Sequence, residues 1–261
     1  MNQTLELIAK RRSLRRYDPA PLSAEEKSAI LEAALRAPTA GNMMLYTILD
    51  ITDQALKDRL AVTCDNQPFI ASAPLVLIFL ADYQRWWDTW VIGGAEARAR
   101  ELGREPRRPQ EGDLMLAASD AIIAAQNAVV AAESLGIGSC YIGDILENYE
   151  THRELLNLPP YAAPVCMLCF GRPAADEPQR KLQPRLPREF IVQENRYHRL
   201  QPDEIDALYK PHTERYFPEG NYPLQAENYG QVSYLRKFIA EFSVEMSRSV
   251  RVMLERWRTG E

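Results

Sequence analysis

The densest group of residues able to do chemistry lies near the start of the chain, where five cations surround one hydroxyl. Residues 10–16 read Lys-Arg-Arg-Ser-Leu-Arg-Arg, in a chain whose formal net charge is −5. Guanidinium groups bind phosphate oxygens in pairs, and a serine hydroxyl adds a further donor. A phosphomonoester is therefore the ligand that suits this cluster. On composition alone, a basic turn exposed to solvent explains the residues at least as well.

A second candidate, the C-x-x-C pattern of Cys166 and Cys169, does not predict a metal or redox site. It lies in an apolar run, residues 163–170, that reads as a buried strand, where positions i and i+3 face opposite sides. The chain has four cysteines and three histidines, and no second pair is nearby. We therefore expect core cysteines and no metal.

The common catalytic motifs are also missing. The sequence contains no G-x-G-x-x-G, no P-loop, no G-x-S-x-G and no H-E-x-x-H. The chain therefore lacks the minimum motifs of a Rossmann dehydrogenase, a phosphotransferase, a serine hydrolase or a zincin. We therefore name no catalytic side chain, and expect a bound cofactor to supply the chemistry.

Apolar periodicity and end signals predict alternating helices and strands around this cluster. The expected helices are residues 4–10, 23–37, 54–63, 114–135 and 147–156. The expected strands are residues 47–51, 74–81, 139–142 and 164–170, of which 74–81 is apolar on both faces. This order predicts a sheet flanked by helices, of the α+β or α/β class.

The end of the chain has a different texture. Eight of the eighteen prolines lie between residues 172 and 228. A final helix is expected over residues 231–257, with an apolar stripe that includes Phe242, Met246, Met253 and Trp257. The stripe packs either on the core of its own subunit or across a dimer.

Composition limits the class of protein. With 46% hydrophobic and 26% charged residues, the 261-residue chain is globular, and 31 Lys+Arg against 36 Asp+Glu argue against nucleic-acid binding. The first 13 residues lack the apolar core of a secretory signal. The run at residues 73–81 is too short to cross a bilayer. We expect a cytoplasmic protein without a membrane partner.

Several segments together resemble the nitroreductase superfamily, specifically its oxygen-insensitive nitroreductase and flavin reductase branch. They are R-R-S-L-R-R-Y at 11–17, A-P-T-A-G-N at 37–42, Gln67 ahead of S-A-P-L-V-L-I-F-L-A-D at 72–82, G-I-G-S-C-Y-I-G-D at 136–144, and F-G-R-P at 170–173 followed by Q-P-R-L-P at 183–187. The resemblance implies an α+β fold, with a mixed sheet flanked by helices, in an intertwined homodimer with FMN at the interface. Residues 1–197 would be the FMN-binding domain, and 198–261 a Pro-rich arm and C-terminal helix extending it across the dimer.

The resemblance also implies the residues that contact FMN. They are Arg11, Arg12, Ser13, Arg15 and Arg185 at the phosphate, Thr39 and Asn42 from the partner subunit, Gln67 at the pyrimidine edge, and Tyr141, Ile142, Gly143 and Asp144 near N5 and O4. Gln183 stands where many relatives have Lys, and Met44 where they usually have Gln. Trp86, Trp87 and Trp90 either pack against the dimer partner or form a wall of the cavity over the flavin.

The implied activity is ping-pong transfer of hydride from NAD(P)H through FMN to a small flat acceptor, such as a nitroaromatic, a quinone or free flavin. Two alternatives stay open. One is different flavin chemistry on the same fold, such as reductive dehalogenation or flavin fragmentation. The other is a non-catalytic flavin-binding protein.

Overall fold

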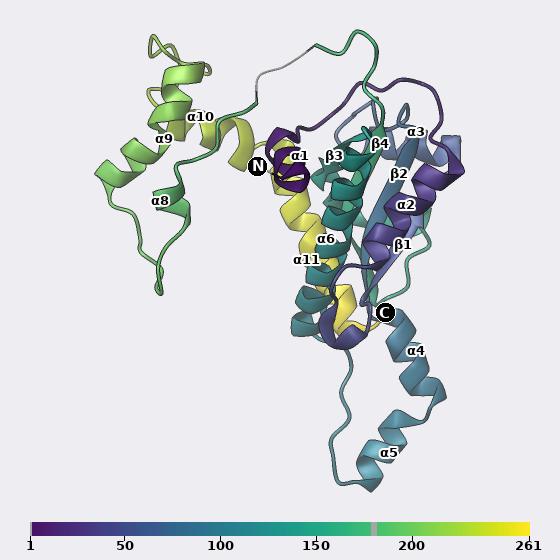
Figure 1. Ribbon diagram of the computed structural model, residues 1–261. Coiled ribbons are helices and arrows are strands. Elements are labelled where there is room, and N and C mark those ends of the chain that lie inside the picture. Colours follow the sequence, from purple (N-terminus) through teal and green to yellow (C-terminus); the bar gives the residue numbers. More distant parts are fainter. Residues whose placement is uncertain (1, 179–181) are drawn as a thin grey trace. The chain divides into compact units, whose positions relative to one another are not determined.

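The chain divides into two compact units in the computed structural model, which describes residues 2–178 and 182–261 (Figure 1). Unit 1 comprises Met1–Pro178 and Glu245–Glu261, and unit 2 is Gln179–Val244. Both ends of unit 2 are therefore joined to unit 1. The predicted boundary between an FMN-binding domain, residues 1–197, and an extending arm, residues 198–261, concerns function rather than compactness, and it stays a prediction.

Unit 1 is built on a four-stranded sheet with the order β1-β2-β4-β3. The strands are β1 (Tyr46–Asp50), β2 (Leu75–Asp82), β3 (Gly138–Ile142) and β4 (Ala162–Gly171). All three neighbouring pairs are antiparallel. Among the described residues, a parallel contact occurs only as the single bridge between Ser13 and Ser139. The α+β class is confirmed, although these four strands do not form the mixed sheet that the resemblance implied.

The sheet has a hydrophobic core on each face. All eight residues of β2 are buried, as its apolar run predicts. Leu77 and Phe79 belong to one core, and Val76 and Ile78 to the other. Cys166 and Cys169 likewise fall in different cores, and all four cysteines are free and buried. The prediction of core cysteines on opposite faces is confirmed.

Most helices of unit 1 lie near the predicted positions, but the two over residues 84–92 and 95–101 were not predicted. The helices of unit 1 before the C-terminal segment are α1 (Gln3–Lys10), α2 (Ala24–Leu35), α3 (Gln54–Thr63), α4 (Gln84–Ile92), α5 (Ala95–Glu101), α6 (Glu111–Ser134) and α7 (Tyr149–Leu155). Ser23 and Glu26 form the capping box that the sequence indicates at the start of α2. Figure 1 shows α4 and α5 projecting from one end of the sheet. Short 3₁₀ turns, η1 (Ala40–Asn42) and η2 (Gly143–Leu146), complete this unit.

The central helix α6 packs its small side chains on the sheet and on α2. Ala121, Ala124, Ala125 and Ala128 are fully buried there. The absence of long side chains at these positions lets the backbones approach closely. By length and composition α6 could also cross a membrane, a property that core helices of soluble proteins share.

Unit 2 contains α8 (Arg188–Ile191), α9 (Pro202–Tyr216), α10 (Tyr229–Ser233) and a π-helical turn η3 (Tyr234–Phe238). The C-terminal helix α11 (Glu241–Thr259) follows. The single helix predicted over residues 231–257 is therefore wrong, because the π turn and Ile239–Ala240 interrupt it. Beyond Glu245, Met253 and Trp257 are buried in unit 1 with Tyr83 and Tyr161. This part of the stripe packs on the core of its own subunit.

Candidate active site

The basic segment after α1 runs beside strand β3. The Leu14 N–H donates to the Ser139 carbonyl at 2.9 Å, and the Leu14 side chain is buried. A Cβ on Gly138 would lie 2.7 Å from the Leu14 side chain, so glycine is required for this close approach. Burial of Leu14 fixes the segment on the protein and leaves the flanking arginines at its surface.

Three polar side-chain atoms near this segment are buried without a hydrogen-bond partner among the described residues. Two are donors, Nη1 of Arg11 and Oγ of Ser139, and one is an acceptor, Oε1 of Glu133. Ser139 lies opposite Ser13 in the parallel bridge and is fully buried. A buried polar atom without a partner costs about 1–3 kcal/mol. The two donors, Arg11 Nη1 and Ser139 Oγ, therefore fit a bound anion, which would accept from both.

The other cations of the segment have separate surroundings. The Arg15 guanidinium lies over the Phe69 ring, 5.8 Å from its centroid. Arg16 instead pairs with Asp176 at 2.5 Å, and this pairing raises the pKa of Arg16. Burial raises the pKa of nearby Glu133, and the positive charges of Arg11 and Arg12 oppose that rise. Arg16 is thus already committed to a carboxylate of the protein.

Gln67 and the η2 turn form a second part of the candidate site. The Gln67 Nε2 donates to the Cys64 carbonyl at 2.9 Å and to the Asp144 carboxylate at 2.7 Å. Asp144 follows Ile142, which is buried, and Gly143, beside which a Cβ would meet nothing within 4 Å. Tyr141 is half-buried and its hydroxyl lies 3.3 Å from Gln126. The structure therefore brings Gln67 and residues 141–144 together.

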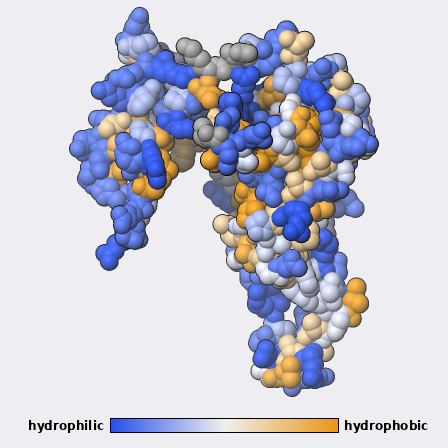
Figure 2. Space-filling view, in the orientation of Figure 1, coloured by the Kyte–Doolittle hydropathy of each residue, from blue (hydrophilic) through white to orange (hydrophobic). Residues whose placement is uncertain are grey.

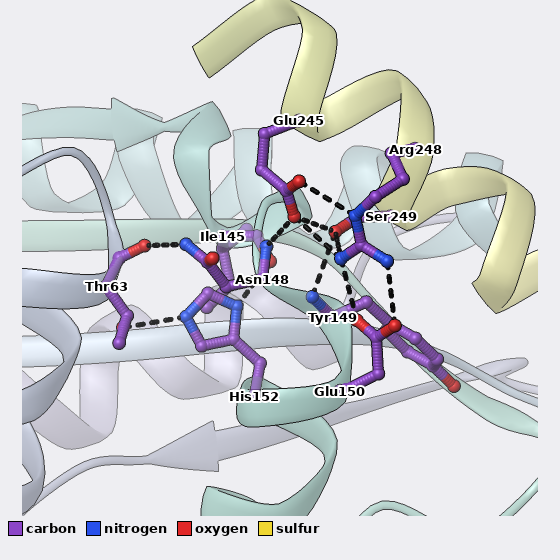
Figure 3. A network of polar contacts seen from close by, with 9 residues as sticks. All are labelled: Thr63, Ile145, Asn148, Tyr149, Glu150, His152, Glu245, Arg248 and Ser249. Carbon is purple, nitrogen blue, oxygen red and sulfur yellow. Dashed lines mark hydrogen bonds and ion pairs between the residues drawn. The ribbon is translucent and has the colours of Figure 1, made fainter. Parts of the chain in front are cut away.

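A network of polar contacts fixes the far side of the η2 turn (Figure 3). His152 is fully buried, with Nδ1 3.0 Å from the Ile145 carbonyl and Nε2 2.8 Å from the Thr63 hydroxyl. Because a carbonyl only accepts, Nδ1 carries the proton and Nε2 accepts from Thr63. Burial lowers the pKa of His152, so the ring is neutral and serves as a structural connector between α3, η2 and α7.

The same network attaches the C-terminal helix. Arg248 donates to both oxygens of Glu150, at 2.7 and 2.8 Å, and to Glu245. Glu245 also accepts from the backbone N–H of Asn148 at 3.1 Å. In Figure 3, α11 and the start of α7 face each other across these contacts. The turn that bears Asp144 is therefore held from several directions.

Thr39 and Asn42 lie in a third region, the loop before β1. Asp120 of α6 organises this loop, and its side chain is 3% exposed. The Asp120 carboxylate accepts from the Thr39 hydroxyl, from the Ala40 N–H at 3.0 Å and from the Leu45 N–H at 3.2 Å. Asn42 and Met44 adopt positive φ angles of 57° and 50°. The loop is compact and its Thr39 side chain points toward the protein interior.

The tryptophans of α4 have different surroundings. Trp86 donates to the Met43 carbonyl at 2.9 Å, next to the loop organised by Asp120. Trp87 and Trp90 line a cavity of about 310 Å³, which Arg107 and Arg108 also border. The Trp87 ring lies 5.5 Å from the Tyr161 ring. Trp86 is thus hydrogen-bonded to the loop in which Thr39 and Asn42 lie, and all three tryptophans share a hydrophobic cluster with Ala40 and Met43 of that loop.

Gln183 and Arg185 belong to unit 2, so their predicted place at the phosphate site of unit 1 stays a prediction. Within unit 2, Gln183 accepts from the Tyr216 hydroxyl.

Sequence reasoning missed two residues of the site, Asp120 and Glu147. A lone Asp in an Ala-rich helix is a signal that could have found Asp120, whereas nothing in the sequence marks Glu147, which is buried one turn after Asp144.

Comparison with known proteins identifies the class. Residues 8–172 match the Nitroreductase family, to which the chain belongs. It is 32% identical over 207 residues to an NADPH-flavin oxidoreductase of Vibrio harveyi, covering 79% of this chain and 80% of that protein. It is 34% identical over 217 residues to an oxygen-insensitive NADPH nitroreductase of Salmonella typhimurium, covering 83% of each. The crystal structure of nitroreductase A from Vibrio parahaemolyticus is similar, with a TM-score of 0.80, 28% identity and 98% coverage of both chains.

Proposed function

We propose that this chain is an FMN-dependent NAD(P)H oxidoreductase that reduces small flat acceptors, such as nitroaromatics, quinones or free flavin, by a ping-pong reaction. Relatives named NADPH-flavin oxidoreductase, oxygen-insensitive NADPH nitroreductase and FMN reductase support this activity and both cofactors. Bound FMN would supply the chemistry, because it accepts hydride from the nicotinamide and passes it to the acceptor. The chain's own residues bind and orient the flavin.

The observation that carries this proposal is the pair of buried, unpartnered atoms at Arg11 and Ser139. Arg11, Arg12, Ser13 and Arg15 would bind the ribityl phosphate along the segment beside β3. A phosphate in this place would accept hydrogen bonds that no described residue accepts. Arg16 would contribute little, since it pairs with Asp176.

The remaining contacts would orient the isoalloxazine ring. Gln67 would hydrogen-bond the pyrimidine edge, and Tyr141, Ile142, Gly143 and Asp144 would place backbone N–H groups near N5 and O4. Open space beside Gly143 supports a close approach by the ring. From the partner subunit, Thr39 and Asn42 would contact the flavin, while Gln183 and Arg185 of unit 2 would complete the phosphate site.

A homodimer in the cytoplasm would complete these sites. Helix α6 supports the dimer, because it exposes a row of large apolar side chains. These are Met115 (68% exposed), Leu116 (44%), Ile122 (49%) and Ile123 (39%). Figure 2 shows further hydrophobic groups over α4 and α5, which also project from unit 1. Apolar surface of this kind marks an interaction site in a soluble protein.

The test is the visible spectrum of the purified protein, followed by analysis of the released cofactor. We expect the absorption of oxidised flavin and release of FMN rather than FAD. NAD(P)H should be oxidised when menadione is added. A colourless protein that fails to bind added FMN would refute the proposal. Bound FMN without NAD(P)H oxidation would instead indicate a non-catalytic flavin-binding protein, and product analysis would detect other flavin chemistry.

A further inference from the structure

Glu147 is a buried carboxyl group with an unusual set of neighbours. It is 5% exposed, and its Oε1 has no hydrogen-bond partner among the described residues. Its backbone N–H donates to the Asp144 carbonyl at 3.1 Å, which closes the η2 turn and places the two residues one turn apart. Within residues 2–178 and 182–261, Glu147 forms no salt bridge.

The groups that face Glu147 offer it no positive charge. Asp144 comes from η2, Asp65 from the loop after α3, and Glu245 from α11. Burial first, and then the Asp144 carboxylate, raises the pKa of Glu147 to about 8. His152 of α7 is neutral, and the Cys64 thiol stays protonated because burial raises its pKa. Glu147 therefore carries its proton at neutral pH.

The Asp144 carboxylate fixes the orientation of the Gln67 amide. The atom of Gln67 that faces the Cys64 carbonyl and Asp144 must be the nitrogen, because both neighbours accept. Oε1 is then the end of the amide that can accept from a ligand. The N3–H at the pyrimidine edge of a flavin is such a donor.

We propose that Glu147 and Asp144 form a carboxyl pair that shares one proton, orients Gln67 and sets the charge beside the pyrimidine edge of the bound flavin. This inference rests on the proposed function. Glu147 is a positioning residue, since it acts through Asp144 and Gln67. With one proton the pair has a charge of −1. Loss of that proton from Glu147 to solvent makes the charge −2, with no electron transferred.

The second negative charge would disfavour reduced flavin, which is anionic. At an effective dielectric constant of about 20, two like unit charges about 10 Å apart repel each other strongly enough to weaken binding roughly tenfold. Reduced FMN should therefore bind about tenfold less well, relative to oxidised FMN, once Glu147 ionises. For a two-electron couple, a tenfold change equals about 30 mV.

The first measurement is the midpoint potential of the FMN-loaded protein as a function of pH, for the wild type and Glu147→Gln. The difference between the two curves removes the pH dependence of the flavin itself. Below pH 7 we expect the two curves to coincide or to stay parallel. Above pH 8 the midpoint potential of the wild type should fall by about 30 mV more than that of Glu147→Gln. Glu154→Gln, an exposed change on α7, should follow the wild type.

The second measurement detects the proton without reference to activity. In protein labelled with ¹³C at glutamate Cδ, one resonance should titrate near pH 8. It should be missing in Glu147→Gln and should titrate at lower pH in Asp144→Asn. If Glu147→Gln fails to fold, the titrations of the wild type and Asp144→Asn still show whether a glutamate beside Asp144 titrates near pH 8.

Two outcomes would overturn the inference. They are parallel potential curves across the whole pH range, and the absence of any glutamate that titrates above pH 7. Both leave the proposed function intact, because FMN is still bound. Failure of the wild type to bind FMN would refute the proposed function, while the NMR titration would still report on the pair.

Discussion

Replacing Asp120 tests whether one buried carboxylate organises the loop between α2 and β1. In Asp120→Ala the Leu45 N–H, in a residue with no exposed surface, and the Ala40 N–H both lose their acceptor. Hydrogen bonds to a charged group contribute about 1.5–3 kcal/mol each, and their losses are not additive. We expect the free energy of unfolding to fall by about 3–5 kcal/mol, the usual effect of breaking a buried polar network.

Asp120→Asn separates the charge from the shape of the side chain. The amide can still accept from the Ala40 N–H through its oxygen, but its NH₂ group would face the Leu45 N–H. We expect the free energy of unfolding to fall by about 1–2 kcal/mol, so that this variant is less stable than the wild type and more stable than Asp120→Ala. The fluorescence of Trp86 should also change, since Trp86 donates to the Met43 carbonyl of this loop.

The assay is urea unfolding at pH 7, followed by circular dichroism and tryptophan fluorescence. Asp88→Ala is the matched control, because Asp88 is exposed and accepts from Gln84 on its own helix. Its effect should stay within about 0.5 kcal/mol. If Asp120→Ala unfolds at the same urea concentration as Asp88→Ala, with an unchanged slope, the loop does not depend on Asp120 and our reasoning is wrong.

Three further predictions concern other parts of unit 1. Arg15→Ala should weaken FMN binding about ten- to a hundredfold, or about 1.5–3 kcal/mol, whereas Arg16→Ala should do much less, as fluorescence titration with FMN can show. Trp257→Ala, which removes a buried ring whose Nε1 donates to the Gln110 carbonyl at 3.0 Å, should lower the free energy of unfolding by about 3–5 kcal/mol. Hydrogen bonding to Arg248 lowers the pKa of Glu245 to about 2, so the stabilisation from Glu245 is fully present above its unfolded pKa and is lost as the pH falls through about 2. Urea midpoints of the wild type and Glu245→Gln should therefore converge as the pH falls below about 4.

Each of these predictions has a contrary result. Equal effects of Arg15→Ala and Arg16→Ala would mean that the basic segment acts only as a diffuse positive field. A Trp257→Ala variant as stable as the wild type would mean that the end of α11 does not belong to the core of unit 1. If the urea midpoints of the wild type and Glu245→Gln differ by a constant amount down to pH 2, the ionised carboxylate of Glu245 is not the source of the stabilisation.

Local signals in the sequence were sufficient for most elements of unit 1. The expected helix over residues 54–63 coincides with α3, because Asp53 caps its first turn through a neighbouring N–H. The continuous apolar run of β2 indicated a strand buried on both faces, and it is one. These features depend on residues within a few positions of each other, which a single sequence displays directly.

Long-range arrangements could not be predicted in the same way. Asp120 accepts from residues 75 to 81 positions earlier in the chain, and Glu147 faces Asp65 and Glu245, so their surroundings exist only after folding. In the sequence, apolar residues keep spacings of three and four from Val232 to Trp257, so periodicity does not show the interruption near Ile239. The site residues beside β3 were named from resemblance, since their spacing alone fits an exposed basic turn equally well.

The placement of unit 2 between two segments of unit 1 has a consequence for proteolysis. A protease that cuts once within residues 182–244 divides the protein into two polypeptides, but neither holds a complete core of unit 1. The shorter one retains Trp257 buried against Tyr83 and Tyr161, and Arg248 bound to Glu150 of the longer one. The nicked protein should thus remain a single particle under native conditions and separate only when denatured. Gel electrophoresis and size-exclusion chromatography would then report different molecular masses for the same sample.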